Sequence, residues 1–127
     1  MASSTIEAKR VLIWENPNHT AGVSTGTTIS LDTTQYNEFE VVSTFVNALD
    51  SMTETFKCPQ GYKLNTALVA LDTTTTGYAA INYTCRTIDV GVDPNKIVIG
   101  AGYMFYQGAL YAGWDARCVP QYIYGIK

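Results

Sequence analysis

The stretch that decides the fold is the last one, residues 96–127, KIVIGAGYMFYQGALYAGWDARCVPQYIYGIK. It opens with a strand-like run of apolar and β-branched residues over 97–102 and closes with a second run over 118–126. Aromatic residues and glycines alternate between the two runs. A strand that reaches almost to the last residue predicts a chain end tied into a sheet, so we expect this segment to be needed for folding.

Working outward, the rest of the chain reads as short strands separated by turns. Pro17 between asparagines, Pro59-Gln60-Gly61 and Asp93-Pro94-Asn95 are turn signals. Residues 48–53 predict a loop or a single helical turn, and residues 55–58 a short edge strand. Turns recur about every 8–12 residues, which predicts an all-β fold: a jelly-roll-like antiparallel β-sandwich of about eight strands. The other expected strands cover residues 10–14, 27–31, 38–47, 63–71 and 78–88.

One irregularity is expected within the strand at residues 78–88. Ile81, Tyr83 and Cys85 share one face, but the apolar residues that follow, Ile88 and Val90, fall on the other parity. Such a change of phase predicts a β-bulge near Arg86-Thr87.

Length and composition limit the class of protein. A chain of 127 residues predicts one domain, which we place at residues 10–127 after a polar lead-in or linker at residues 1–9. Hydrophobic residues make up 46% and charged residues 15%, which is too apolar for a disordered chain. The net charge of −3 with scattered basic residues argues against nucleic acid. The apolar runs are shorter than the ~20 residues of a bilayer span, and the first residues lack the apolar core of a signal peptide.

The residue types needed for common chemistries are scarce. The single histidine, His19, sits in a Pro/Asn loop and is expected to be solvated, which disfavours a His-based metal site or a Ser-His-Asp triad. Glu38 and Glu40 share one strand face, as exposed acids often do, and Asp89-x-Gly91-x-Asp93 is better explained as a turn than as a calcium loop. We therefore expect no catalytic residue, no metal and no cofactor. The cysteines form no CxxC motif and are expected to be free thiols in a reducing compartment: Cys58, Cys85 and Cys118.

The aromatic segment between the two final strands admits two interpretations. Trp and Tyr rings offer flat apolar faces with polar tips, and glycines let the backbone bring rings together. In the first interpretation the rings form a recognition surface. In the second, which we favour, they plug one end of the sandwich or pack against a neighbouring subunit. The candidate recognition residues are Tyr103, Tyr106, Tyr111, Trp114, Asp115 and Arg117.

The last strand also bears on assembly. Tyr122, Tyr124 and Ile126 line one side of it, and Val119 and Ile123 the other. Apolar residues on both faces need cover on both. A small sandwich supplies one inner face, so we expect a homo-oligomer in which Tyr122, Tyr124 and Ile126 contact another copy.

Both ends of the chain resemble small bacteriophage and prophage structural proteins. Residues 11–18 (VLIWENPN), 28–32 (TISLD) and 36–41 (YNEFEV) are similar to a pattern of LLW-NP followed by TISLDLS-YD, and residues 119–127 (VPQYIYGIK) to an IP-xx-IYGIK ending. The resemblance does not cover residues 47–96. Within the TISLDLS pattern, Thr33-Thr34 stands where Leu-Ser is usual. The aromatic insert between the two final strands has no counterpart in the pattern. The family looks like tail or fibre components of virions.

The resemblance implies a non-enzymatic virion protein, made in the host cytoplasm. It implies self-association, with a trimer favoured, contact with other virion proteins, and recognition of host surface polysaccharide. Two alternatives stay open: a structural capsid or fibre-attachment module that binds only other virion proteins, and a free-standing carbohydrate-binding module. No binding residue is implied, because no site motif accompanies the resemblance.

Overall fold

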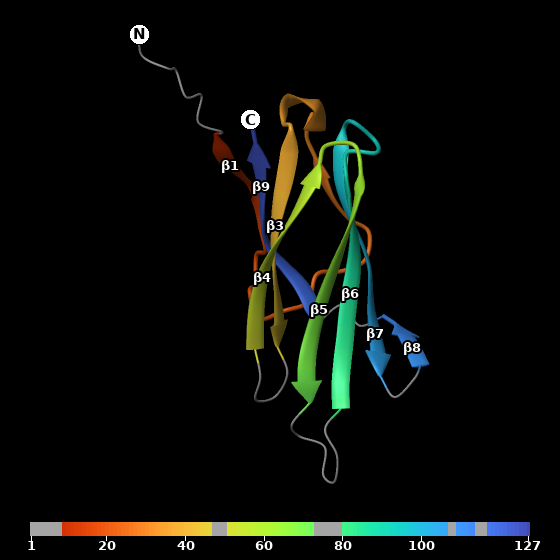
Figure 1. Ribbon diagram of the computed structural model, residues 1–127. Coiled ribbons are helices and arrows are strands. Elements are labelled where there is room, and N and C mark those ends of the chain that lie inside the picture. Colours follow the sequence, from red (N-terminus) through yellow and green to blue (C-terminus); the bar gives the residue numbers. More distant parts are fainter. Residues whose placement is uncertain (1–8, 47–50, 73–79, 107–108, 114–116) are drawn as a thin grey trace.

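The computed structural model describes residues 9–46, 51–72, 80–106, 109–113 and 117–127, and these form two antiparallel sheets (Figure 1). The first sheet contains, in spatial order, β1 (Arg10–Glu15), β9 (Cys118–Ile126), β3 (Glu38–Val46) and β4 (Ser51–Pro59). The second contains β2 (Thr27–Ser30), β7 (Lys96–Tyr106), β6 (Ala80–Val90) and β5 (Lys63–Asp72), and β8 (Ala109–Ala112) pairs with the second half of β7. A 3-10 helix, η1 (Thr33–Gln35), lies between β2 and β3.

The predicted all-β antiparallel sandwich is confirmed, with nine strands in the described part of the chain. The chain changes sheet four times, from β1 to β2, from β2 to β3, from β4 to β5 and from β8 to β9, as expected of a jelly-roll-like fold. Its middle runs as hairpins, β3–β4 within one sheet and β5–β6–β7 within the other. The closing strand lies between β1 and β3, so the end of the chain is held on both sides, as expected.

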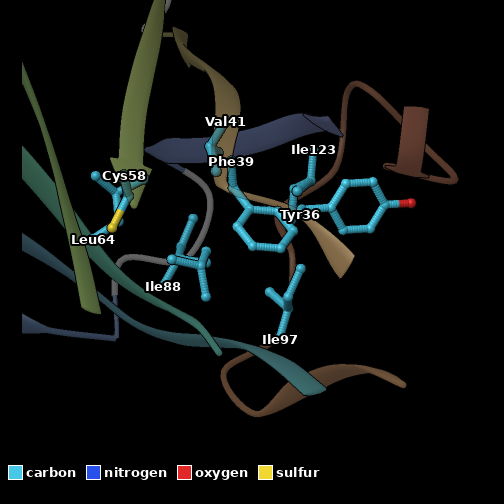
Figure 2. Close-up of a cluster of buried hydrophobic side chains, with 9 residues drawn as sticks. Tyr36, Phe39, Val41, Cys58, Leu64, Ile88, Ile97 and Ile123 are labelled. Atoms are coloured by element: carbon cyan, nitrogen blue, oxygen red, sulfur yellow. The ribbon is translucent and has the colours of Figure 1, made fainter. Parts of the chain in front are cut away.

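The core lies between the two sheets. Figure 2 shows Phe39 and Val41 of β3 and Ile123 of β9 facing Ile88 of β6 and Ile97 of β7. Each of these side chains is fully buried. Burying an aliphatic or aromatic side chain of this size stabilises a fold by about 1.5–3 kcal/mol relative to leaving it exposed, so this cluster is the main apolar contact between the sheets.

One expected element differs from the structure. Residues 51–53, predicted as part of a loop or helical turn, begin β4, which pairs with β3 along its whole length from Val46↔Ser51 to Glu38↔Pro59. The partner strand is long and regular, and pairing with it overrides the weak local signal. The expected turn that follows is present, and Gly61 has φ 93°, a left-handed conformation that suits glycine.

The predicted bulge is at the expected place, but the phase argument behind it is wrong. Thr84, Arg86, Ile88 and Val90 all face inward, so β6 keeps one parity throughout. The register with β7 shifts between Arg86 and Ile88, where two residues of β7, Gly100 and Ala101, lie opposite one residue of β6. The consequence is that Tyr83 and Cys85, which the apolar pattern placed inside, face outward.

Candidate functional site

An apolar row crosses the outer face of the second sheet. Val69 of β5 pairs with Tyr83 of β6, Tyr83 with Phe105 of β7, and Phe105 with Leu110 of β8. Directly paired residues of antiparallel strands point to the same face, so these four side chains form one line across four strands. Their exposed fractions are 47%, 46%, 42% and 63%. Tyr83 and Phe105 meet edge to face, with ring centroids 6.3 Å apart.

A second row lies beside the first. Ala67 pairs with Cys85, Cys85 with Tyr103, and Tyr103 with Ala112. The two rows together are called the apolar face below. None of its eight residues carries a charge, and interaction sites are among the few reasons for a protein to expose such a patch.

The inward side of these strands includes three buried polar residues. Thr66, Thr84 and Arg86 are at most 1% exposed. At this end of the sandwich, Thr66, Thr84 and Arg86 point in beside Leu68 and Met104, while Val69, Tyr83 and Phe105 point out. The apolar face was missed because apolar side chains lie on both sides of these strands, so the sequence pattern does not show which phase faces inward.

The predicted recognition residues do not form one surface. Tyr103 is half-buried and belongs to the apolar face, but Tyr111 pairs with the buried Met104 and therefore points to the opposite side of the sheet, where it is 45% exposed. Arg117 is half-buried just before β9. The backbone of Tyr106 pairs with Ala109. The side chain of Tyr106, together with Trp114 and Asp115, lies outside the described residues.

The predicted oligomer contact on β9 is partly covered by the same chain. The rings of Tyr122 and Tyr124 stack with centroids 6.1 Å apart on the outer face of the first sheet. The Arg10 guanidinium lies 3.5 Å from the centroid of Tyr124, and His19 lies 5.1 Å from Tyr122. Ile126 is only 8% exposed. Cover that was expected from a neighbouring copy is thus supplied in part by Arg10 and His19.

A pocket of about 280 Å³ opens beside the loop that carries the chain from β1 to β2. Its largest apolar lining residue is Trp14, which also packs against two clusters of the core. A register shift in β1 places Leu12 opposite Tyr124 but Trp14 opposite Ile123, so the bulge turns the indole to the inner side. The lining consists of Trp14, Asn16, Pro17, Asn18, Ala21, Gly22, Val23, Ser24 and Thr27.

A polar network holds this loop against the first sheet. The buried Gln121 donates from Nε2 to His19 O (3.1 Å) and to Thr44 Oγ1 (2.7 Å). Its Oε1 accepts from His19 Nδ1 (2.6 Å) and from Asn16 Nδ2 (3.4 Å). Asn16 also donates to Ala21 O (3.3 Å). His19, expected to be merely solvated, is therefore a half-exposed member of this network.

Arg86 holds the loop from the second sheet. Its guanidinium is buried between the sheets, where Nε donates to Gly100 O (2.9 Å) and Nη2 donates to Val23 O. Val23 itself is buried against Ile99 and Val119. The two sides of the loop are thus fixed by charge-assisted and amide hydrogen bonds, which favour a single conformation.

Several ionisable groups of the described residues have structural partners. Glu40 pairs with Arg10 (2.9 Å) and Lys57 (3.6 Å), and Asp89 accepts from the amides of Gly91 (3.2 Å) and Val92 (2.8 Å), as expected of a turn. Burial raises the pKa of all three thiols, which are free, so little reactive thiolate forms near neutral pH. Within the described ranges, no three His, Cys, Asp or Glu side chains come together as a metal site. No described helix has the length and hydropathy of a membrane span.

Comparison with protein-family models, with curated proteins and with solved structures found no match for this chain.

Proposed function

We propose that the chain is a non-enzymatic assembly module that joins copies of itself through the apolar face. The observation that carries the proposal is the row Val69, Tyr83, Phe105 and Leu110, each more than 40% exposed on one sheet face. Covering these side chains removes apolar surface from water at about 25 cal/mol per Å², and this favours association.

A second copy is the partner that fits this face best. Its eight residues carry no charge, so two copies can stack without leaving a charge unpaired. Two sheets packed face to face sit about 10 Å apart and interdigitate their side chains. A two-fold axis through the face would make the contact isologous, each copy contributing the same residues.

The area of the apolar face determines how much additional surface an interface centred on it would need. With strands about 4.8 Å apart and rows about 7 Å apart, the eight residues cover roughly 270 Å² of sheet. A standard interface buries roughly 800 Å² per partner, with an apolar centre and a polar rim. The apolar face is therefore the centre of such an interface, and neighbouring polar residues of the second sheet form the rim.

The setting that we propose for this assembly is a bacteriophage or prophage virion, as a tail- or fibre-type domain. This part rests on the resemblance of residues 11–18 and 119–127 to the structural proteins of such particles. In this setting a trimer is the alternative to the two-fold dimer, and contacts with other virion proteins and recognition of host polysaccharide belong to the same proposal. Detection of the chain in purified particles by mass spectrometry tests the virion setting, and its absence from them contradicts it.

Sedimentation velocity over micromolar to high micromolar concentration tests the self-association. We expect the wild type to form a defined oligomer and Phe105→Glu to sediment as a folded monomer, because the carboxylate would be buried unpaired in the contact. Ser30→Glu is the matched control: it adds the same charge to an exposed position in β2 and is expected to assemble normally.

Each outcome of that experiment has a consequence. A wild type that stays monomeric throughout contradicts the assembly function. An oligomer that survives Phe105→Glu moves the contact away from the apolar face, with Tyr122 and Tyr124 as the next candidates. A dimer supports the isologous contact and excludes the trimer, whereas a trimer requires a contact between unlike surfaces.

A further inference from the structure

The pocket beside Trp14 is separate from the apolar face. It lies at the edge of the sandwich where β1 and β2 border the two sheets, and the β1–β2 loop crosses between them there. The apolar face lies on β5 to β8. The network around Gln121 and the buried Arg86 hold this loop, and burying such groups is costly unless they are hydrogen-bonded. Their bonds fix the pocket before any ligand arrives.

The lining determines what kind of ligand fits. Trp14 is the largest apolar residue of the lining, and Asn18, Ser24 and Thr27 add an amide and two hydroxyls, of which that of Thr27 donates to Ser24 O (2.8 Å). None of the described lining residues carries a charge, so the pocket has no counterion for a charged ligand. Its volume of about 280 Å³ is near the lower end of small-molecule sites, which favours one ring rather than an extended chain.

A neutral pyranose has the matching chemistry. One face of the ring is made of C–H groups that pack on an aromatic plane, and its edge carries hydroxyls that both donate and accept hydrogen bonds. Amide and hydroxyl side chains satisfy such edges because they too act in both roles. We propose that this pocket binds a single neutral sugar ring, packed on Trp14, as the terminal unit of a glycan, an inference that rests on the polysaccharide recognition proposed above.

Ligand-observed saturation-transfer NMR with a panel of neutral methyl pyranosides tests this on the full chain. We expect saturable transfer for at least one pyranoside, strongest at the ring C–H protons of one face. Ser24→Phe fills the pocket without removing a backbone contact, because Ser24 meets Thr27 through its carbonyl. We expect it to weaken binding by at least about tenfold, roughly 1.4 kcal/mol.

Two controls keep the result interpretable. Ser30→Phe adds the same ring at an exposed position that does not line the pocket, and it is expected to bind within about twofold of the wild type, less than about 0.4 kcal/mol. Phe105→Glu tests independence from assembly: it is expected to bind the sugar as the wild type does, even where it fails to oligomerise. If Ser24→Phe does not fold, Ala21→Phe, at another exposed lining residue, takes its place.

Three results would overturn the inference. The first is transfer that rises linearly with sugar concentration for every member of the panel. The second is equal loss of binding in Ser24→Phe and Ser30→Phe. The third is saturable, Ser24-dependent transfer to a proline-rich peptide but to none of the sugars, because Trp14 and Pro17 would then line a peptide groove.

Discussion

Thr66 and Thr84 lie on adjacent strands, and both point into the sandwich. The Thr66 hydroxyl donates to Arg86 O at 3.1 Å and lies 3.3 Å from Cys118 Sγ. The Thr84 hydroxyl is buried without a hydrogen-bond partner among the residues that the structure describes, as is that of Ser43. A buried polar group that is not paired costs free energy, whereas a paired one does not.

This difference predicts opposite effects of the same substitution. Thr84→Val replaces an unpaired hydroxyl by a methyl of similar size and should raise the free energy of unfolding by about 1 kcal/mol. Thr66→Val removes a donor from a carbonyl and should lower it by about 1–2 kcal/mol. Urea denaturation measures both values. If Thr84→Val destabilises the protein as much as Thr66→Val does, the Thr84 hydroxyl is hydrogen-bonded in solution.

Cys118 gives the fold a pH dependence on the alkaline side. Burial raises the pKa of its thiol, and the hydrogen bond with Thr66 and the charge of Arg86 offset this only in part. The unfolded chain therefore loses this proton at lower pH, near the ordinary value of about 8.5, than the folded chain does. The contribution of this thiol to the free energy of unfolding is fully present below about pH 8.5, and it is lost as the pH rises through the pKa of the thiol in the folded chain.

The expected measurement is a comparison of urea midpoints at pH 7.5 and pH 10 under reducing conditions. Cys118→Ala, although less stable at both pH values, should lose less stability across this interval than the wild type. The lysines and tyrosines are the same in both proteins, so they cancel in the comparison. An equal loss in the two proteins would show that Cys118 does not contribute to the alkaline decline.

At the level of elements, the β1–β2 loop depends on groups far away in the sequence. Arg86 meets Val23 across 63 positions, and Gln121 meets His19 across 102. Arg86→Met removes the donor to Val23 O and Gly100 O and leaves two carbonyls without it. We expect a loss of about 2–4 kcal/mol, because charge-assisted bonds of this kind contribute about 1.5–3 kcal/mol each and removing the buried charge recovers part of its desolvation.

Hydrogen exchange locates that loss. The Gly26 amide, which donates to Ile99 O at 2.8 Å, should exchange faster in Arg86→Met by a larger factor than amides of the β3–β4 hairpin. Arg10→Met is the matched control, because Arg10 is an exposed arginine in a surface ion pair with Glu40. Such pairs contribute about 0–1 kcal/mol, and the loop should keep its protection. Uniform acceleration in Arg86→Met would mean that Arg86 stabilises the whole sandwich and does not specifically hold the loop.

The elements that could be predicted from sequence are those whose signal is local. Pro59-Gln60-Gly61 and the alternation in residues 38–46 determine a turn and a strand without help from elsewhere. The phase of β6 could not be predicted, because Tyr83 and Cys85 look as apolar as Ile88 and Val90. Which set faces inward is decided by the opposite sheet, where Cys118 meets Thr66 and Leu68. The pocket was also missed because it depends on contacts across the fold: the residues that hold its loop, Arg86 and Gln121, are distant from it in sequence.

At the scale of the whole molecule, assembly and stability are expected to be coupled. If copies associate through the apolar face when folded and not when unfolded, association adds to the free energy of unfolding by mass action. The melting temperature of the wild type should therefore rise with protein concentration, by several degrees over a hundredfold range, since the contribution grows by up to about 2.7 kcal/mol per hundredfold increase.

The variants separate this coupling from ordinary core packing. Phe105→Glu should melt at one temperature regardless of concentration, because its carboxylate prevents the contact, whereas Ser30→Glu should follow the wild type. At the lowest concentration Phe105→Glu and the wild type should converge, because Phe105 is 42% exposed in the single chain and contributes little to its core. If Phe105→Glu instead remains far less stable than the dissociated wild type, the ring is needed within one sandwich, and the apolar face is a strained part of the fold rather than a surface for another copy.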